Sequence, residues 1–318
     1  MGKCEATRCF PNSVEFGMQG TDLTYEPLSP WAEMMDLPKL QRLTIAKCPG
    51  ADGFVTALAR RYPGRCFHLE HLALDLDSGK ALSTALKSCL SITSLHVNTS
   101  YPLHIDATSD KLKAHRSSIR TLALNRRDLD HGKDGFTDST FMKLCEACYN
   151  VQYFGIHLVE DHMALEFALD SELYGFLPRI EVLCTLRQLR VIHCRLPLES
   201  PPIYEYDETG KTPRLVDWEM LRFCNAIFGY MEERRACPSL KAIIVGQWFE
   251  AGDAREGVGY PRHCFIRGYQ TDLLNRKTAV AVPVPAYRTR ELKPECDLLD
   301  FDPMGVWVGG TPRRVHRF

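Results

Sequence analysis

The sequence predicts a mixed α/β fold in which short parallel strands alternate with helices. Triplets of aliphatic residues recur along the chain, spaced by three and then two positions, and each is typical of a short strand with one buried side. Between most triplets, apolar residues recur at the period of an amphipathic helix. Strands separated by helices in this order require a parallel sheet.

The composition is that of a globular protein with a substantial core. The chain has 318 residues, of which 45% are hydrophobic and 25% charged. Its formal net charge is -1, so bulk electrostatics favour neither nucleic acid nor anionic lipid as a partner. No apolar run approaches the roughly 18 residues of a membrane span, and no secretory leader is recognisable. We therefore expect an intracellular protein, cytoplasmic or nuclear, with no nucleic-acid or membrane partner.

Cysteine is frequent, with 13 residues, and the number is odd. Several of these cysteines fall where the repeating pattern requires a small apolar group, which favours buried free thiols in a reducing compartment over a disulfide framework. Cys145 and Cys148 form a C-x-x-C motif, but a zinc ribbon needs a second such pair and the sequence has none. We predict that this pair packs in the core, and we predict no metal site and no cofactor.

The clearest single unit lies at residues 186–196. The fixed positions of the leucine-rich-repeat pattern L-x-x-L-x-L-x-x-(N/C)-x-L are filled there by Leu186, Leu189, Val191, Cys194 and Leu196. Similar apolar triplets begin at positions 40, 69, 92, 119, 151 and 240. This spacing predicts a leucine-rich-repeat horseshoe solenoid, similar to the ribonuclease-inhibitor type but with irregular repeats.

The pattern divides the chain into three parts. Residues 1–37 show no sustained period and are expected to form a cap or lead-in. Residues 38–250 form the repeat domain, with a proline-rich and acidic insertion at 197–213. Residues 251–318 are expected to form a hairpin, with Asn275 in its turn, followed by a tail. Pro283 would then lie on a free edge of the sheet.

Two segments carry a resemblance to a known family. The sequences LPKLQRLTI (37–45) and CPSLKAIIV (237–245) resemble the leucine-rich-repeat portion of F-box proteins, most closely the divergent group of filamentous fungi. In that family the repeats hold a protein substrate while an N-terminal F-box docks onto a cullin ubiquitin ligase. Residues 1–37 contain no recognisable F-box. The resemblance therefore implies substrate recognition, with ubiquitin-ligase components as partners only if an F-box exists elsewhere.

The candidate binding surface follows from alternation along each strand. Side chains two, four and six positions after the start of a triplet should point out of the concave face of the sheet. This set is polar, mixed in charge and contains three histidines: Arg42, His71, Asp75, His96, Asn98, Asn125, Tyr153, His157, Gln188 and Arg190. Repeat proteins tend to bind partners on such a surface, although an ordinary solvated face would have the same composition. Histidines that titrate near pH 6 would make binding depend on pH.

The sequence therefore favours a non-enzymatic scaffold that binds a protein partner on the concave face. One alternative is an enzyme whose cleft is formed by the loops 197–213 and 246–260, with Trp248 and Glu250 in its lining. Another is a nucleic-acid binder that uses the basic C-terminal tail, against which the net charge argues. A doubly wound sheet is the alternative fold; it requires continuous apolar strands, whereas most of these strands alternate with polar residues.

Overall fold

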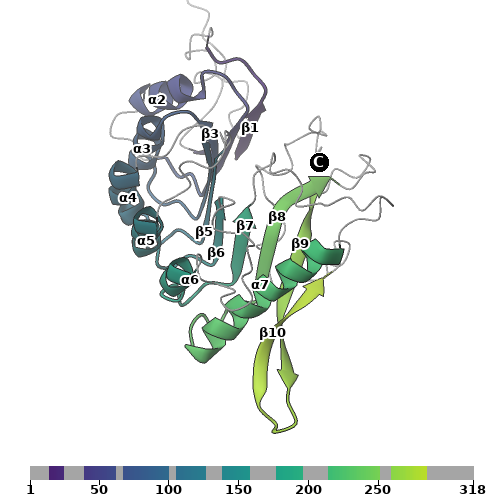
Figure 1. Ribbon diagram of the computed structural model, residues 1–318. Coiled ribbons are helices and arrows are strands. Elements are labelled where there is room, and N and C mark those ends of the chain that lie inside the picture. Colours follow the sequence, from purple (N-terminus) through teal and green to yellow (C-terminus); the bar gives the residue numbers. More distant parts are fainter. Residues whose placement is uncertain are drawn as a thin grey trace, which may run out of the picture.

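The computed structural model describes residues 14–24, 39–61, 67–99, 105–126, 138–157, 177–195, 214–250 and 259–284. Within these residues the chain forms one open sheet of ten strands, and the strands lie in the sheet in the same order as in the sequence (Figure 1). The mixed α/β class predicted from the sequence is confirmed.

The elements alternate along the chain. The strands are β1 (Glu15–Gln19), β2 (Arg42–Ala46), β3 (His71–Leu76), β4 (Ser94–Thr99), β5 (Thr121–Arg126), β6 (Tyr153–His157), β7 (Val191–Arg195), β8 (Ala242–Glu250), β9 (Gly259–Thr271) and β10 (Lys277–Val284). The helices are α2 (Ala51–Arg61), α3 (Gly79–Ser88), α4 (Ile105–Ala114), α5 (Asp138–Ala147), α6 (Leu177–Leu183) and α7 (Arg214–Glu233). Strands β1 to β8 are parallel, and β9 and β10 continue the sheet in antiparallel pairs.

One hydrogen-bond arrangement repeats along the edge at which the parallel strands begin, here called the starting edge. The carbonyl oxygen of Gln41 accepts the backbone N–H groups of Glu70 at 2.8 Å and His71 at 3.0 Å. Equivalent carbonyls each accept two N–H groups from the next unit along the chain. These carbonyls belong to Val14, Glu70, Thr93, Arg120, Gln152 and Arg190. A carbonyl oxygen has two lone pairs, so a single peptide group can bind both donors. Successive units are therefore attached to one another at equivalent positions.

The main core lies between the sheet and the helices, which pack against one face (Figure 1). On β2 the side chains of Leu43 and Ile45 point into this core and are 2% and 0% exposed. Helix α3 contributes Leu82 and Leu86, which lie one turn apart on its buried face. The hydroxyl of Ser78 accepts the N–H of Lys80 at 3.1 Å and caps the start of this helix.

Strand β1 was not predicted, because residues 1–37 show no repeated pattern. In the sheet, Phe16 and Met18 take the places that Leu43 and Ile45 occupy on β2. The chain after β1 lies close to the turn after β2. At that turn Gly50 has φ 81°, and a Cβ added there would lie 2.6 Å from the backbone nitrogen of Thr24. Glycine is therefore required at this close approach.

The predicted C-terminal hairpin is confirmed: β9 and β10 pair along their whole common length, and Asn275 adopts φ 59° in the turn. Helix α7 packs on β10, where Ala279 is 2% exposed. The side-chain oxygen of Asn225 on α7 accepts the N–H of Ala281 at 2.6 Å. Pro283, which has no N–H group, also lies on this strand, the last of the described sheet. Both features limit further strand pairing at that edge.

Candidate functional site

The face of the sheet opposite the helices is here called the open face, and it is the face to which alternation along the strands assigns the candidate binding residues. Residues on this face line up across the strands in rows. One row contains Arg42 on β2, His71 on β3 and Ser94 on β4, each paired with the next. The next row contains Thr44, Ala73 and His96 in the same relation. Since neighbouring strands are about 4.8 Å apart, side chains within a row are in reach of one another.

Strands β2 to β4 bring the predicted polar residues together. We define the polar half of the open face as Arg42, Thr44, His71, Asp75, Ser94, His96 and Asn98. Five of the ten predicted site residues belong to it, and alternation places them all on the same face. Alternation along the strands, read from the sequence, therefore assigned these five residues to one face correctly.

The sixth repeat was predicted in the wrong register. The shared carbonyl of Gln152 accepts the N–H groups of Arg190 and Val191 at 2.7 and 2.9 Å, so β7 begins at Val191. Gln188 and Arg190 therefore precede the strand and lie at the starting edge rather than on the open face. The open-face positions belong instead to Val191 and His193, which pair with Tyr153 and Gly155.

For two further predicted residues, Asn125 and His157, the structure describes the backbone only. Asn125 pairs with Asn98, and His157 pairs with Arg195. Their side chains lie outside the described part of the chain. The insertion 197–213 and the whole segment 246–260, proposed as the alternative catalytic cleft, likewise lie outside the residues whose side chains are described.

Much of the open face is buried, which contradicts the expectation of a solvated surface. Asp75, His96 and Tyr153 are only 3%, 5% and 3% exposed, whereas Arg42 is exposed and His71 is half-buried. Asp75 has a structural role, since its Oδ2 atom accepts the backbone N–H of Lys47 at 2.8 Å. This bond joins β3 to the turn that follows β2.

Strands β5 to β9 carry an apolar cluster on the same open face. We define the apolar half as Ala123, Tyr153, Val191, Ala242, Ile244 and Cys264, which form a second hydrophobic cluster separate from the main core. Each of these side chains is at most 3% exposed. Adjacent apolar residues in β7 and β8, such as Ile243 and Ile244, therefore serve two cores on opposite faces of the sheet.

A buried polar pair lies within the apolar half. The hydroxyl of Tyr153 and Nδ1 of His193 are 2.6 Å apart, and the two rings meet edge to face. His193 is 0% exposed. Hydrogen bonding offsets the cost of removing these polar atoms from water. The pair thus joins β6 to β7 on the open face. The predicted register of β7 did not place His193 on this face, so the sequence did not indicate the pair.

The electrostatics of the polar half centre on His71. Partial burial and the neighbouring Arg42 guanidinium lower the pKa of His71 from its ordinary value, while the carboxylates of Glu70 and Glu15 act weakly in the opposite direction. The neutral imidazole, which can both donate and accept a hydrogen bond, therefore predominates near pH 7.

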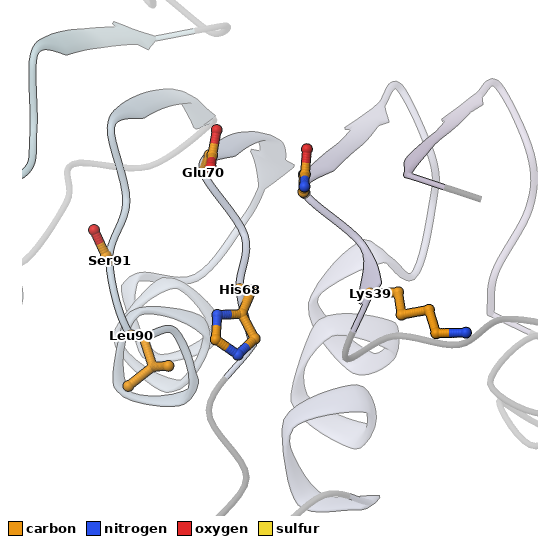
Figure 2. A pocket seen from close by; sticks show the side chains of 6 residues that line it. Lys39, His68, Glu70, Leu90 and Ser91 are labelled. Carbon is orange, nitrogen blue, oxygen red and sulfur yellow. The ribbon is translucent and has the colours of Figure 1, made fainter. Parts of the chain in front are cut away.

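A cavity of about 500 Å³ opens at the starting edge beside β2, β3 and β4. Figure 2 shows the side chains of Lys39, His68 and Leu90 around it. Gln41 and Glu70 also line it, and their carbonyls belong to the shared hydrogen bonds described above. The cavity is the gap between successive units, and its lining side chains are exposed. This arrangement does not form an enclosed site.

The nine described cysteines are free thiols, and all except Cys184 are buried. Burial raises the pKa of Cys148 and of Cys194 to about 12, so both remain protonated at neutral pH. The C-x-x-C pair lies in the core, as predicted, with Cys145 and Cys148 at 1% and 0% exposure. Within the described residues, no group of three or more His, Cys, Asp or Glu side chains is arranged to hold a metal ion.

Across the described part of the chain, no helix has the length and apolar character needed to cross a membrane. Comparison of the chain with protein-family models and with curated protein sequences found no match.

Proposed function

We propose that the protein is a leucine-rich-repeat-type scaffold, without catalytic activity, that binds a protein partner on the polar half of its open face. The main observation that supports this proposal is the row of shared carbonyls at the starting edge. From Val14 to Arg190, each unit binds the next through the same pair of backbone hydrogen bonds. Arrays in which each unit contacts its neighbours form extended surfaces that suit protein recognition.

The polar half is favoured over the apolar half as the binding surface. Arg42 is exposed, and His71, Thr44 and Asn98 keep part of their surface in solvent. These side chains come from adjacent parallel strands and offer hydrogen-bond donors and acceptors around the buried Asp75, Ser94 and His96. The apolar half is already buried and offers little area to a partner.

The resemblance of the repeats to those of F-box proteins suggests a more specific role. On that reading, the partner is a protein held for ubiquitination. The scaffold function does not depend on this reading, because it requires only a stable repeat array with an accessible polar surface.

The proposal is tested by affinity capture from cells that express the protein, followed by chemical cross-linking. A double substitution of Arg42→Glu and His71→Ala should abolish capture of a partner that the unmodified chain retains, and cross-links should map to β2–β4. Lys87→Glu, an exposed change on the helix side, serves as the matched control and should leave capture unchanged. Equal capture by a folded double variant would exclude the polar half as the binding surface.

A further inference from the structure

We propose that the tip of the β9–β10 hairpin is a membrane-contact site, at which Leu273 and Leu274 insert into the interface of an anionic phospholipid bilayer. The tip is defined as residues 271–277, from the last residue of β9 to the first residue of β10. This inference does not rest on the proposed partner binding, because the polar half lies on β2 to β4, towards the other end of the sheet.

Two adjacent leucines at the tip lie in solvent. Leu273 is 105% exposed and Leu274 is 72% exposed, the highest values among large hydrophobic side chains in the described part of the chain. Every residue from 269 to 278 is exposed as well. Figure 1 shows the hairpin extending past α7 and away from the parallel strands. A flat surface such as a bilayer can therefore reach the tip before it meets the sheet.

The turn holds the leucines in place without burying them. Oδ1 of Asp272 accepts the backbone N–H groups of Leu274 at 2.8 Å and Arg276 at 2.9 Å, and Oδ2 accepts Nε of Arg276 at 2.7 Å. The N–H of Asn275 donates to the carbonyl of Asp272 at 2.9 Å. Asp and Asn stabilise turns in this way, and none of these bonds requires an apolar side chain. The turn geometry therefore does not explain why two leucines occupy it.

The charges beside the leucines favour an anionic surface. Arg276 and Lys277 follow the turn, and both are exposed. Hydrogen bonds from the backbone and the side chain of Arg276 lower the pKa of Asp272, so this carboxylate stays charged and compensates the guanidinium. Lys277 then leaves one net positive charge at the tip. A lysine close to a bilayer is attracted by anionic headgroups.

The small size of the tip favours a bilayer over a protein groove. A stable protein–protein interface buries about 1,200–2,000 Å² of surface, far more than two leucines at the end of a narrow hairpin can contribute. A bilayer interface needs no complementary shape. Apolar side chains enter it while neighbouring polar and cationic side chains stay at the level of the headgroups. The polar neighbours Gln270, Thr271 and Asn275 are exposed and suit that position.

The net charge of the chain does not argue against this contact. The sequence-based expectation of no membrane partner rested on the net charge of -1 and on the lack of an apolar run long enough to span a membrane. Both properties describe the chain as a whole, whereas a peripheral contact depends on the few residues that reach the surface. Because the tip offers two apolar side chains and one net charge, binding should be weak and reversible.

The test measures binding of the full-length chain to lipid vesicles by flotation. The wild type should bind vesicles of phosphatidylcholine with roughly one-third phosphatidylserine about fivefold more tightly than vesicles of phosphatidylcholine alone. Lys277→Gln should remove this preference. The double variant Leu273→Ser and Leu274→Ser should bind both kinds of vesicle about tenfold more weakly than the wild type. Leu90→Ser, which replaces a leucine that is 53% exposed elsewhere, is the matched control and should bind as the wild type does.

A tryptophan at the tip reports insertion directly. The fluorescence emission of Leu273→Trp, taken as the difference from the wild type, should shift to shorter wavelength when anionic vesicles are added. Such a shift is expected when an indole moves from water into the bilayer interface. Circular dichroism and the urea midpoint establish that each variant is folded, because every substituted position is exposed and should tolerate the change.

Three outcomes would overturn the proposal. In the first, the wild type binds neither kind of vesicle, whether or not a cross-linker at the tip captures another protein. In the second, the folded double serine variant binds vesicles as tightly as the wild type. In the third, the wild type sediments as a dimer that the double serine variant does not form, because the leucines would then be buried between two copies of the chain.

Discussion

The polar and apolar halves of the open face share one arrangement of backbone hydrogen bonds but differ in the polarity and exposure of their side chains. Thr44 on β2 and Ile244 on β8 lie in the same row of the sheet, in strands attached by the same kind of hydrogen bonds. Thr44 keeps part of its surface in solvent, while Ile244 is 0% exposed and belongs to a second hydrophobic cluster. A repeated backbone therefore does not by itself determine whether a given unit can bind a partner.

The sequence of each strand explains this difference. On β2, polar residues such as Arg42 and Thr44 alternate with Leu43 and Ile45, as expected for a sheet with one solvated face. On β8, Ala242 to Val245 are continuously apolar, which is typical of a strand buried on both faces. The continuous apolar strands that would have indicated a doubly wound sheet are thus present, but only in the second half of the array.

The largest effect is expected when a charged side chain is placed in the apolar half, and the quantity that changes is the free energy of unfolding. Ile244→Asp puts a carboxylate into a fully buried apolar site and should lower the free energy of unfolding by about 3–5 kcal/mol. Thr44→Asp, in the same row of the polar half, should change it by less than about 1 kcal/mol. Urea unfolding monitored by circular dichroism measures both. Similar costs for the two variants would show that the halves do not differ in burial.

A smaller effect is expected from the buried polar pair. Tyr153→Phe removes the hydroxyl that lies 2.6 Å from His193 and should lower the free energy of unfolding by about 1–3 kcal/mol. A double-mutant cycle with His193→Ala should give a coupling energy of about 1 kcal/mol, measured in the same unfolding experiments. Additive effects of the two substitutions would mean that the hydrogen bond does not contribute to stability.

The polar half should respond to pH through His71. Folding lowers the pKa of this imidazole, so the unfolded chain binds the proton more tightly than the folded one. The contribution of His71 to stability is therefore complete above the unfolded pKa of about 6.5 and decreases as the pH falls below it. Unfolding midpoints at pH 7.5 and 5.5 should differ less for His71→Gln than for the wild type. An equal difference would assign the pH dependence to other groups.

The smallest effect on stability is expected for Arg42→Ala. Because this side chain is exposed, its removal should change the free energy of unfolding by less than about 0.5 kcal/mol. If the polar half binds the partner, the same substitution should nevertheless weaken binding by 1 kcal/mol or more, as measured by calorimetry with a partner captured by the wild type. Unchanged affinity would show that Arg42 is not part of the binding surface.

Local patterns in the sequence were sufficient for most of the described strands and helices and for the shared face of five of the ten candidate residues. The spacing of Leu40, Leu43 and Ile45 indicates a strand with one buried side, and the helical period of Leu82 and Leu86 indicates the helix between two strands. Alternation from these positions then places Arg42 and His71 on the same face. These inferences succeed because they depend only on neighbours along the chain.

The register of β7 and the burial of the open face were decided only by the tertiary structure. Leu186, Leu189 and Val191 fit the triplet spacing, but Leu189, Ile192 and Cys194 fit it equally well. The hydrogen bonds from Arg190 and Val191 to the carbonyl of Gln152 select the second reading. Those bonds join positions far apart in the sequence. The sequence by itself therefore determined the alternation of most strands and helices. Contacts between units determined that β1 joins the sheet, how β7 is aligned and which open-face side chains remain accessible.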